Sequence, residues 1–254
     1  MDNDWFTVEE IDENAFAISE YKHWEETHSY LLIGNEKALL IDTGLGVSNI
    51  KNVVDSLTKL PLSVATTHIH WDHIGGHKYF ENIAVYESEK QWLMNFPLSL
   101  NVVKSNLQDN NCPFPEDFDI EKYTVFQGQP QIILHDNEII DLGNRKIKVI
   151  HTPGHSPGHC CYFEKDTGYL FSGDLIYKGC LNIHYPTTDI CDFEESIKRV
   201  MKLSVKRILP AHHSLDISTE IIKKIDNAFK NLRQSGKLKQ GSGIFDYGEF
   251  QIHI

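Results

Sequence analysis

The sequence is poor in arginine, and this scarcity disfavours one large class of function. Of 254 residues, 24 are basic, and the only arginines among them are scattered at Arg145, Arg199, Arg207 and Arg233. Aspartate and glutamate together number 36, so the formal net charge is −12. Because a nucleic-acid-binding surface normally concentrates basic side chains, we expect no nucleic-acid partner.

Long apolar runs are also missing. No segment approaches the roughly 18 consecutive apolar residues of a membrane-spanning helix, so we expect no membrane partner. The acidic start of the chain lacks the basic and apolar regions of a signal peptide. The cysteines number 5, which is odd, and none form a C-x-x-C pair; this favours reduced thiols in the cytoplasm. Cys160 and Cys161 stand in an apolar run and are predicted to be buried.

Low-complexity linkers and short repeats do not occur either. Hydrophobic residues make up 41% of the chain, which is typical of a globular protein and excludes disorder. We therefore predict a single domain over residues 1–254. Residues 88–130 contain Pro97, Pro113, Pro115 and Pro130 and little regular periodicity, so we interpret them as an insertion or lid within that domain.

Hydrophobic periodicity predicts a mixed α/β fold with two β-rich halves and helices outside them. Strands are expected over 15–20, 30–33, 38–41, 62–67, 132–134, 146–150, 159–163, 169–172 and 206–209, with a final edge strand over 250–254. Helices are expected over 47–60, around 92–107, and over 193–203 and 218–234. Asp192 is the expected N-cap of the third helix.

What the sequence has in abundance is histidine. It contains 14, most of them within residues 68–77, 151–159 and 212–213. In an extended segment His68 and His70 project to the same side and can share a metal ion. Asp72 and His73 follow where the chain bends and can reach a second ion. Because imidazole and carboxylate are ligands that Zn²⁺ and related ions accept, this motif predicts a metal site.

Three further motifs offer metal ligands at strand ends. Residues 151–159 contain three histidines, and the sequence alone leaves the choice among them open. Asp174 closes an apolar strand, where a carboxylate is unfavourable unless it is paired or metal-bound. His212 and His213 follow another predicted strand. Loops at the ends of strands on a rigid scaffold commonly carry functional residues.

This ordered set, His-x-His-x-Asp-His followed by His, Asp and His, resembles the metallo-β-lactamase-fold hydrolase superfamily. The resemblance covers residues 38–213 and includes Leu-Ile-Asp-Thr-Gly at 40–44. It implies a four-layer αβ/βα sandwich with a binuclear metal site at one edge of the two sheets. It also implies two divalent metal ions as cofactors, with Zn preferred and Fe or Mn as alternatives.

The resemblance assigns roles residue by residue. The implied metal ligands are His68, His70 and His155 for one ion, Asp72, His73 and His212 for the other, and Asp174 as the bridge. Asp42 is implied to support the metal loop, and His151 to be structural or to orient a ligand through a hydrogen bond. His159 is expected to be structural, whereas the roles of His77 and His213 stay open.

Particular branches of the family differ in how well they match. The commonest zinc β-lactamases carry cysteine where this chain has Asp174, which disfavours that activity. The first histidine motif resembles glyoxalase II, but only 42 residues follow His212, too few for that enzyme's helical glutathione-binding domain. Tyr177, three residues after Asp174, resembles the tyrosine that contacts the substrate carbonyl in acyl-homoserine lactonases. Residues 172–179, together with Tyr185, are similar to an acyl-CoA thioesterase branch.

We therefore expect a binuclear metal-dependent hydrolase acting on a small-molecule thioester, lactone or related ester. A metal-bridging hydroxide would attack the carbonyl, Asp72 would transfer the proton to the leaving group, and Tyr177 would help to stabilise the oxyanion. The alternatives are a phosphodiesterase or nuclease with the same two metals, and a mononuclear iron persulfide dioxygenase. A homodimer is compatible with the sequence.

An apolar acyl pocket is a further expectation, with the protein core as its alternative. The residues concerned are Trp92, Leu93, Met94, Phe96, Phe114 and Phe118.

Overall fold

The computed structural model describes residues 5–254, and the chain forms two compact units. The first unit runs from the N-terminal side through Leu134 and also takes in Asp141–Arg145. The second unit comprises His135–Ile140 and Lys146–Ile254. Over the described range 5–254, none of the helices has the length and apolar character needed to cross a membrane.

A seven-stranded sheet forms the centre of the first unit, and its strands follow one another in chain order. They are β1 (Thr7–Asp12), β2 (Ala15–Ser19), β3 (His28–Ile33), β4 (Ala38–Ile41), β5 (Leu62–Ala65), β6 (Ile83–Tyr86) and β7 (Ile132–Leu134). Pairing is antiparallel from β1 to β4 and parallel from β4 to β7. Antiparallel neighbours need only short turns, whereas each parallel pair needs a longer crossover.

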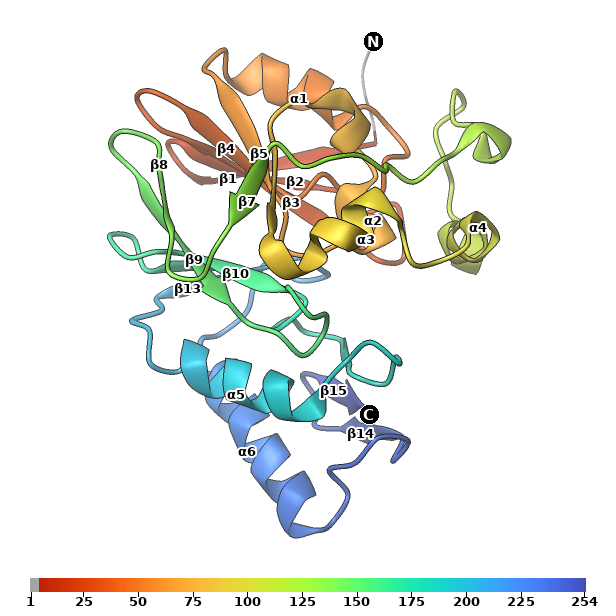
Figure 1. The fold of residues 1–254 in the computed structure, drawn as a ribbon, viewed down its shortest axis with the longest axis vertical. Coiled ribbons are helices and arrows are strands. Elements are labelled where there is room, and N and C mark those ends of the chain that lie inside the picture. Colours follow the sequence, from red (N-terminus) through yellow and green to blue (C-terminus); the bar gives the residue numbers. More distant parts are fainter. Residues whose placement is uncertain (1–4) are drawn as a thin grey trace. The chain divides into compact units, whose positions relative to one another are not determined.

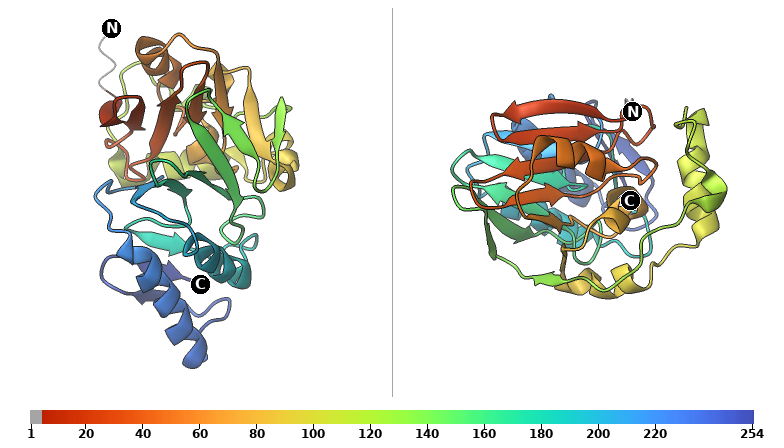
Figure 2. Two further views of the ribbon diagram at one scale, coloured as in Figure 1. Left: turned by 90° about the vertical axis from the view of Figure 1, so that its left-hand side faces the viewer. Right: turned by 90° about the horizontal axis from the view of Figure 1, so that it is seen from above.

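Helix α1 (Ile50–Leu57) is the crossover between β4 and β5. Ile50 and Val54 are buried in one apolar cluster with Leu40 of the sheet, so α1 packs on the strands that it connects (Figure 1). The Asn49 side chain accepts a hydrogen bond from the N–H of residue 51 and begins the helix. Figure 2 shows α1 beside these strands from two further directions.

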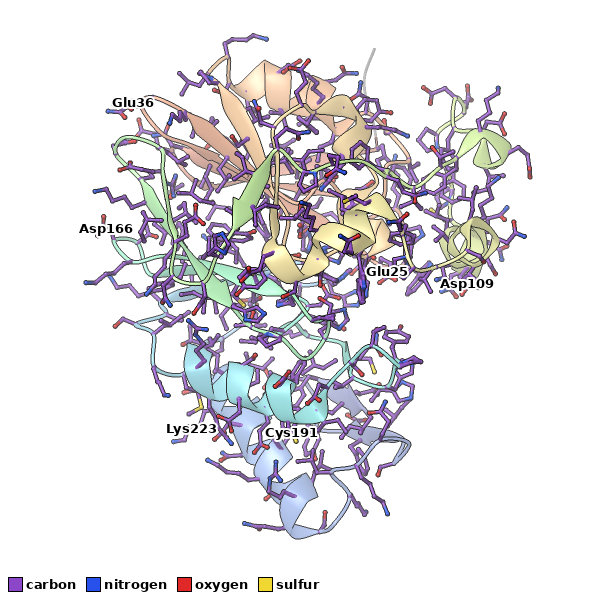
Figure 3. All side chains as sticks on the ribbon, viewed as in Figure 1. Glu25, Glu36, Asp109, Asp166, Cys191 and Lys223 are labelled. Carbon is purple, nitrogen blue, oxygen red and sulfur yellow. The ribbon has the colours of Figure 1, made fainter. Side chains whose placement is uncertain are left out.

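Residues 88–130, the predicted insertion, contribute to the apolar core of the first unit. The short helical elements of this unit are α2 (Trp71–Ile74), η1 (His77–Tyr79), η2 (Glu87–Glu89), α3 (Lys90–Met94), α4 (Leu100–Gln108), η3 (Asp109–Asn111) and η4 (Ile120–Lys122). Leu93, Val103 and Tyr123 are buried in the same cluster as Trp71. Helix α4 lies away from the sheet in the right-hand view of Figure 2, and Figure 3 labels Asp109 beside its end. The lid role and the single-domain assignment stay predictions.

The second unit is built on two sheets and two helices. The five-stranded sheet has the order β13-β11-β10-β9-β8, and the three-stranded sheet has the order β12-β15-β14. The elements are β8 (Ile139–Asp141), β9 (Lys146–His151), β10 (Cys160–Glu164), β11 (Tyr169–Gly173), β12 (Cys180–Asn182), α5 (Ile190–Val200), β13 (Arg207–Pro210), α6 (Glu220–Gln234), β14 (Ile244–Asp246) and β15 (Gln251–His253).

Helices α5 and α6 pack against each other through aromatic side chains. The rings of Phe193 and Phe229 are stacked with their centroids 5.6 Å apart, and both are fully buried. Arg233 of α6 donates a hydrogen bond to the buried carboxylate of Glu194 on α5. In Figure 3 the labels Cys191 and Lys223 mark the two helices.

Several expected elements differ from the observed ones. The helix expected over 47–60 is shorter, because Gly46 has a φ of +72° and Asn49 provides the cap. The helix expected around 92–107 is two helices, interrupted next to Pro97. The N-cap of helix α5 is Asp189 and not Asp192, since Asp189 Oδ1 accepts the N–H groups of residues 191 and 192 at 2.8 and 2.9 Å.

The C-terminal strand is also placed differently from the expectation. Strand β15 lies between β12 and β14 and is therefore the central strand of its sheet, not an edge. The predicted burial of Cys160 and Cys161 is confirmed, since both are fully buried, and the five cysteines are free. The cytoplasmic location stays a prediction.

Candidate metal centre

The first histidine motif occupies the end of β5 and the short helix α2. His68, Asp72 and His73 are almost fully buried, and His70 is half-buried. His68 Nε2 lies 3.0 Å from His70 Nδ1, and His73 Nε2 lies 3.3 Å from Asp72 Oδ2. The rings of His68 and His73 have centroids only 4.1 Å apart. These four side chains, the first-unit donor group, therefore lie close together.

Asp42 fixes the first-unit donor group from the neighbouring strand. The parallel register of β4 and β5 places the residues that follow both strands at the same edge of the sheet. Asp42 Oδ1 accepts the Thr67 N–H at 2.7 Å, and Oδ2 lies 2.7 Å from Thr67 Oγ1 and 3.0 Å from His73 Nδ1. The carboxylate thus orients His73 so that its other ring nitrogen, Nε2, faces Asp72. This geometry agrees with the expected supporting role of Asp42.

His77 has a structural position that the sequence did not indicate. Its Nδ1 lies 2.7 Å from Thr43 Oγ1, and its Nε2 lies 2.9 Å from Thr66 Oγ1. Burial, assisted by the nearby His73, lowers the pKa of His77 to about 3, so the ring is neutral. His77 therefore joins the loop after β4 to the end of β5.

Two buried glutamates that no sequence motif distinguishes hold the backbone around this group. Glu89 accepts the backbone N–H of Ile69, the residue between His68 and His70. Glu20 accepts the Leu45 N–H at 2.8 Å and the Trp5 indole N–H at 2.6 Å. Burial raises the pKa of Glu20 to about 7, although these two hydrogen bonds oppose the shift. No local pattern could have revealed these contacts, because each joins residues that are at least 15 positions apart.

His155, Asp174 and His212 converge in the second unit. Asp174 Oδ1 lies 3.2 Å from His212 Nε2, and Asp174 Oδ2 lies 3.5 Å from His155 Nε2. All three side chains, the second-unit donor group, are at least nine-tenths buried. Each carboxylate oxygen thus faces one imidazole nitrogen.

Strand pairing explains why residues so far apart in sequence meet here. Strands β11 and β13 are parallel, with Gly173 opposite Pro210, so Asp174 and His212 leave the sheet at the same edge. His155 Nδ1 lies 3.0 Å from the carbonyl of Asn182, which orients its ring.

The other histidines of the second unit have different partners. His159 Nε2 accepts the backbone N–H of Asp174 at 3.0 Å, while its Nδ1 lies 2.9 Å from Thr152 Oγ1. His159 is therefore structural and supports Asp174. His151 Nε2 lies 3.0 Å from the carbonyl of Pro157, so its ring contacts the loop that carries His155. His213 packs against Tyr177, with ring centroids 6.0 Å apart.

Tyr177 is buried beside the second-unit donor group. Its ring centroid lies 5.4 Å from that of His212, and its hydroxyl donates a hydrogen bond to the carbonyl of Cys180. The structure thus brings Tyr177 close to a candidate ligand with its hydroxyl engaged by the backbone. Its catalytic role stays a prediction.

The chemistry of the donor residues fits divalent cations. Both groups combine imidazole with carboxylate, the ligand types of zinc-type ions. The outward nitrogens of His73 and His155 are held by Asp42 and by the Asn182 carbonyl, as expected for metal-binding histidines. Each of the seven ligands assigned from the sequence lies in one of the two donor groups, and their metal-binding role stays a prediction.

A cavity of about 860 Å³ lies within the first unit. Phe114 and Phe118, two of the residues expected at an acyl pocket, line it together with Trp5 and Tyr123. Of the remaining expected residues, Leu93 belongs to the core and Trp92 stacks on His70 with ring centroids 6.4 Å apart. None of the first-unit donor residues lines the cavity, so the acyl pocket stays a prediction.

Comparison with known proteins identifies similar sequences. A family model described as the metallo-beta-lactamase superfamily matches residues 24–212. The human acyl-coenzyme A thioesterase MBLAC2 is 30% identical over 230 residues, which cover 82% of this chain and 81% of that protein. The probable metallo-hydrolase YqgX of Bacillus subtilis is 26% identical over 159 residues, covering 61% and 68% of the two chains.

Solved structures share the fold at lower identity. A metallo-beta-lactamase from Pontibacter korlensis has a TM-score of 0.65 and 17% identity, with 89% of this chain and 99% of that chain covered. The superfamily protein ST1585 from Sulfolobus tokodaii has a TM-score of 0.63 and 21% identity, with 86% and 87% covered. The predicted metallo-β-lactamase fold is therefore confirmed.

Proposed function

The chain belongs to the metallo-beta-lactamase superfamily, and from this premise we propose that it is a metal-dependent thioesterase acting on acyl-coenzyme A. The observation that carries the substrate class is the 30% identity to an acyl-coenzyme A thioesterase over 82% of the chain. Lactones and other carboxylic esters undergo the same acyl transfer and are therefore the alternative substrate classes.

The proposed metal ligands follow the order of the family motif. In that order, His68, His70 and His155 would hold one ion, Asp72, His73 and His212 would hold the second, and Asp174 would be shared by the two. The convergence of side chains inside each unit supports this assignment, since each donor group already presents imidazole and carboxylate atoms within 3.5 Å of each other. Zinc is the preferred ion because nitrogen and oxygen donors are its usual ligands.

When bound, two such ions would supply Lewis acidity and lower the pKa of water toward neutrality. The side chains of the protein would then transfer protons and orient the substrate. Asp72 accepts the proton of the attacking water and passes it to the departing group. A thiolate leaves without much assistance, because the pKa of a thiol is about 8.5.

Tyr177 is proposed to stabilise the negative charge that develops on the carbonyl oxygen. It can do so only if its O–H turns from the Cys180 carbonyl toward the substrate, since the two are hydrogen-bonded in the free protein. Packing of its ring against His212 keeps the side chain beside the second-unit donor group.

The decisive experiment combines metal quantification with a substrate panel. The panel contains acyl-coenzyme A esters of several chain lengths, an acyl-homoserine lactone, bis-p-nitrophenyl phosphate and a β-lactam. We expect about two zinc-type ions per chain and preferential hydrolysis of the thioesters. His68→Ala should lose metal and activity, whereas His151→Ala, which removes no proposed ligand, should have a milder effect on both.

Other outcomes would overturn the proposal in distinct ways. Cleavage of the phosphodiester without thioester hydrolysis would make the protein a phosphodiesterase. A single iron ion with oxygen consumption on a persulfide substrate would make it a dioxygenase.

A further inference from the structure

Helix α5 holds the loop that leads to His155. Three backbone carbonyls of this loop are bound by the helix or its cap. Ser196 Oγ donates to the Pro153 carbonyl at 2.7 Å, and the Asp189 N–H donates to the Gly154 carbonyl at 2.8 Å. The third carbonyl, that of His151, accepts a hydrogen bond from Arg199 Nη1 at 3.0 Å. Each of these hydrogen bonds joins the loop to α5 or to its N-cap, and all three lie before His155 in the chain.

Arg199 makes the strongest of these connections, because it also binds a carboxylate. Arg199 Nη2 lies 2.7 and 2.8 Å from the two carboxylate oxygens of Asp136. Asp136 Oδ1 in turn accepts the His151 N–H at 2.9 Å. The backbone of His151 is therefore hydrogen-bonded on both sides, with its carbonyl accepting from Arg199 and its N–H donating to Asp136. Charge-assisted hydrogen bonds of this kind are roughly twice as strong as neutral ones.

The Asp136 carboxylate remains charged under ordinary conditions. Burial opposes ionisation, but the hydrogen bonds from Arg199 and from the His151 N–H outweigh it and keep the pKa of Asp136 below its usual value.

Close packing leaves the loop little freedom to move relative to α5. Gly154 has a φ of +128°, and a Cβ atom there would lie 2.3 Å from the Phe193 nitrogen. The backbone of the loop therefore lies directly on the backbone of the helix. A shift of the loop at His151 would be transmitted to His155, only four residues further along the chain.

We propose that Arg199, through its bonds to Asp136 and to the His151 carbonyl, is a positioning residue that presents His155 to the metal. This inference rests on the proposed metal-dependent function. In this role Arg199 acts through the loop and requires no direct contact with the metal or the substrate. Its contribution is to keep the loop in the metal-binding conformation before the ion arrives, so its loss should weaken metal affinity more than it weakens the fold.

A second arginine–carboxylate pair at α5 provides a matched control. Arg233 of α6 also pairs with a carboxylate, that of Glu194 on α5, but neither residue bonds to the loop. Arg199→Gln and Arg233→Gln each remove one arginine–carboxylate pair in which one partner lies on α5. Only the first removes a bond to the loop that carries His155.

The test measures metal affinity by competition with a chromophoric chelator, together with the melting temperature. We expect Arg199→Gln to weaken affinity about 10- to 100-fold, the usual effect of losing a residue that orients a metal ligand. Arg233→Gln should lower the melting temperature to a similar extent and leave metal affinity within about threefold of the wild type. The visible absorption of the Co²⁺-substituted protein should change in the first variant only, and Arg199→Lys should restore part of the affinity.

Equal metal affinity in the two glutamine variants would overturn the inference and leave Arg199 with a purely structural role. If Arg199→Gln does not fold, Asp136→Asn, which keeps the shape of the side chain but loses its charge, carries the same expectations and the same refutation. Wild-type affinity is measured first. A wild-type protein that binds no metal refutes the proposed function as well, whereas a metal-binding wild type with an unaffected Arg199 variant refutes only this inference.

Discussion

Glu20 should make the stability of the protein depend on pH in an unusual direction. Its carboxyl group is 1% exposed, and burial raises its pKa from 4.5 to about 7. Between these two values the folded protein keeps a proton that the unfolded chain releases. Because the folded state then binds more protons, the free energy of unfolding falls as the pH rises through this window.

The magnitude follows from the two pKa values. The interval from 4.5 to about 7 corresponds to about 3 kcal/mol, which is an upper figure for one group. In Glu20→Gln the contribution disappears, although the amide cannot accept both the Trp5 and the Leu45 hydrogen bond and a constant loss of about 1 kcal/mol is expected. As the pH rises from 4.5 to about 7, the free energy of unfolding of the variant should therefore increase relative to that of the wild type by up to about 3 kcal/mol.

Urea unfolding of both proteins at half-unit pH intervals measures this difference. A chelator is present throughout, so that metal uptake adds no pH dependence of its own. The difference in the free energy of unfolding between variant and wild type cancels the pH dependence of groups common to both, including the buried His77. A difference that stays constant across the window would mean that Glu20 is ionised in the folded protein, and the argument from burial would be wrong.

Three further substitutions test the candidate centre. Asp174→Ala should lower the content of both metal ions, measured by elemental analysis, and retention of full metal content would exclude a bridging role. Tyr177→Phe should reduce kcat about 100-fold with metal content unchanged, whereas an unaltered kcat would restrict the residue to packing against His212. Gly154→Ala should destabilise the protein by about 2 kcal/mol or more in urea unfolding, because its φ is +128° and a Cβ would meet the Phe193 backbone; an unchanged midpoint would contradict this close contact.

The sequence predicted those parts of the fold whose signal is local. The apolar runs before His68, Asp174 and His212 are strands β5, β11 and β13, and each candidate ligand lies just beyond the end of its strand. The pattern works because a strand that is buried on both faces reads as a continuous apolar run. Strand ends could therefore be located to within a few residues.

Residues that act across long sequence separations could not be predicted in this way. Glu20, Glu89 and Arg199 reach backbone atoms 25, 20 and 48 positions away. A buried carboxylate and a surface one are identical in a sequence, and only the folded arrangement shows which is which. The N-cap of α5 was misplaced for a related reason, since Asp189 and Asp192 both suit a cap and only backbone geometry selects between them.

The path of the chain sets a limit on how the protein can be divided. After His135–Ile140 has entered the second unit, Asp141–Arg145 returns to the first. There Arg145 donates to the Asn14 carbonyl at 2.8 Å, and the Asn144 side chain accepts the N–H of residue 35 at 2.9 Å. A fragment ending at residue 134 would lack these bonds, and one beginning at residue 146 would lack strand β8. Neither unit is a continuous piece of polypeptide, so their folding is coupled through the chain itself.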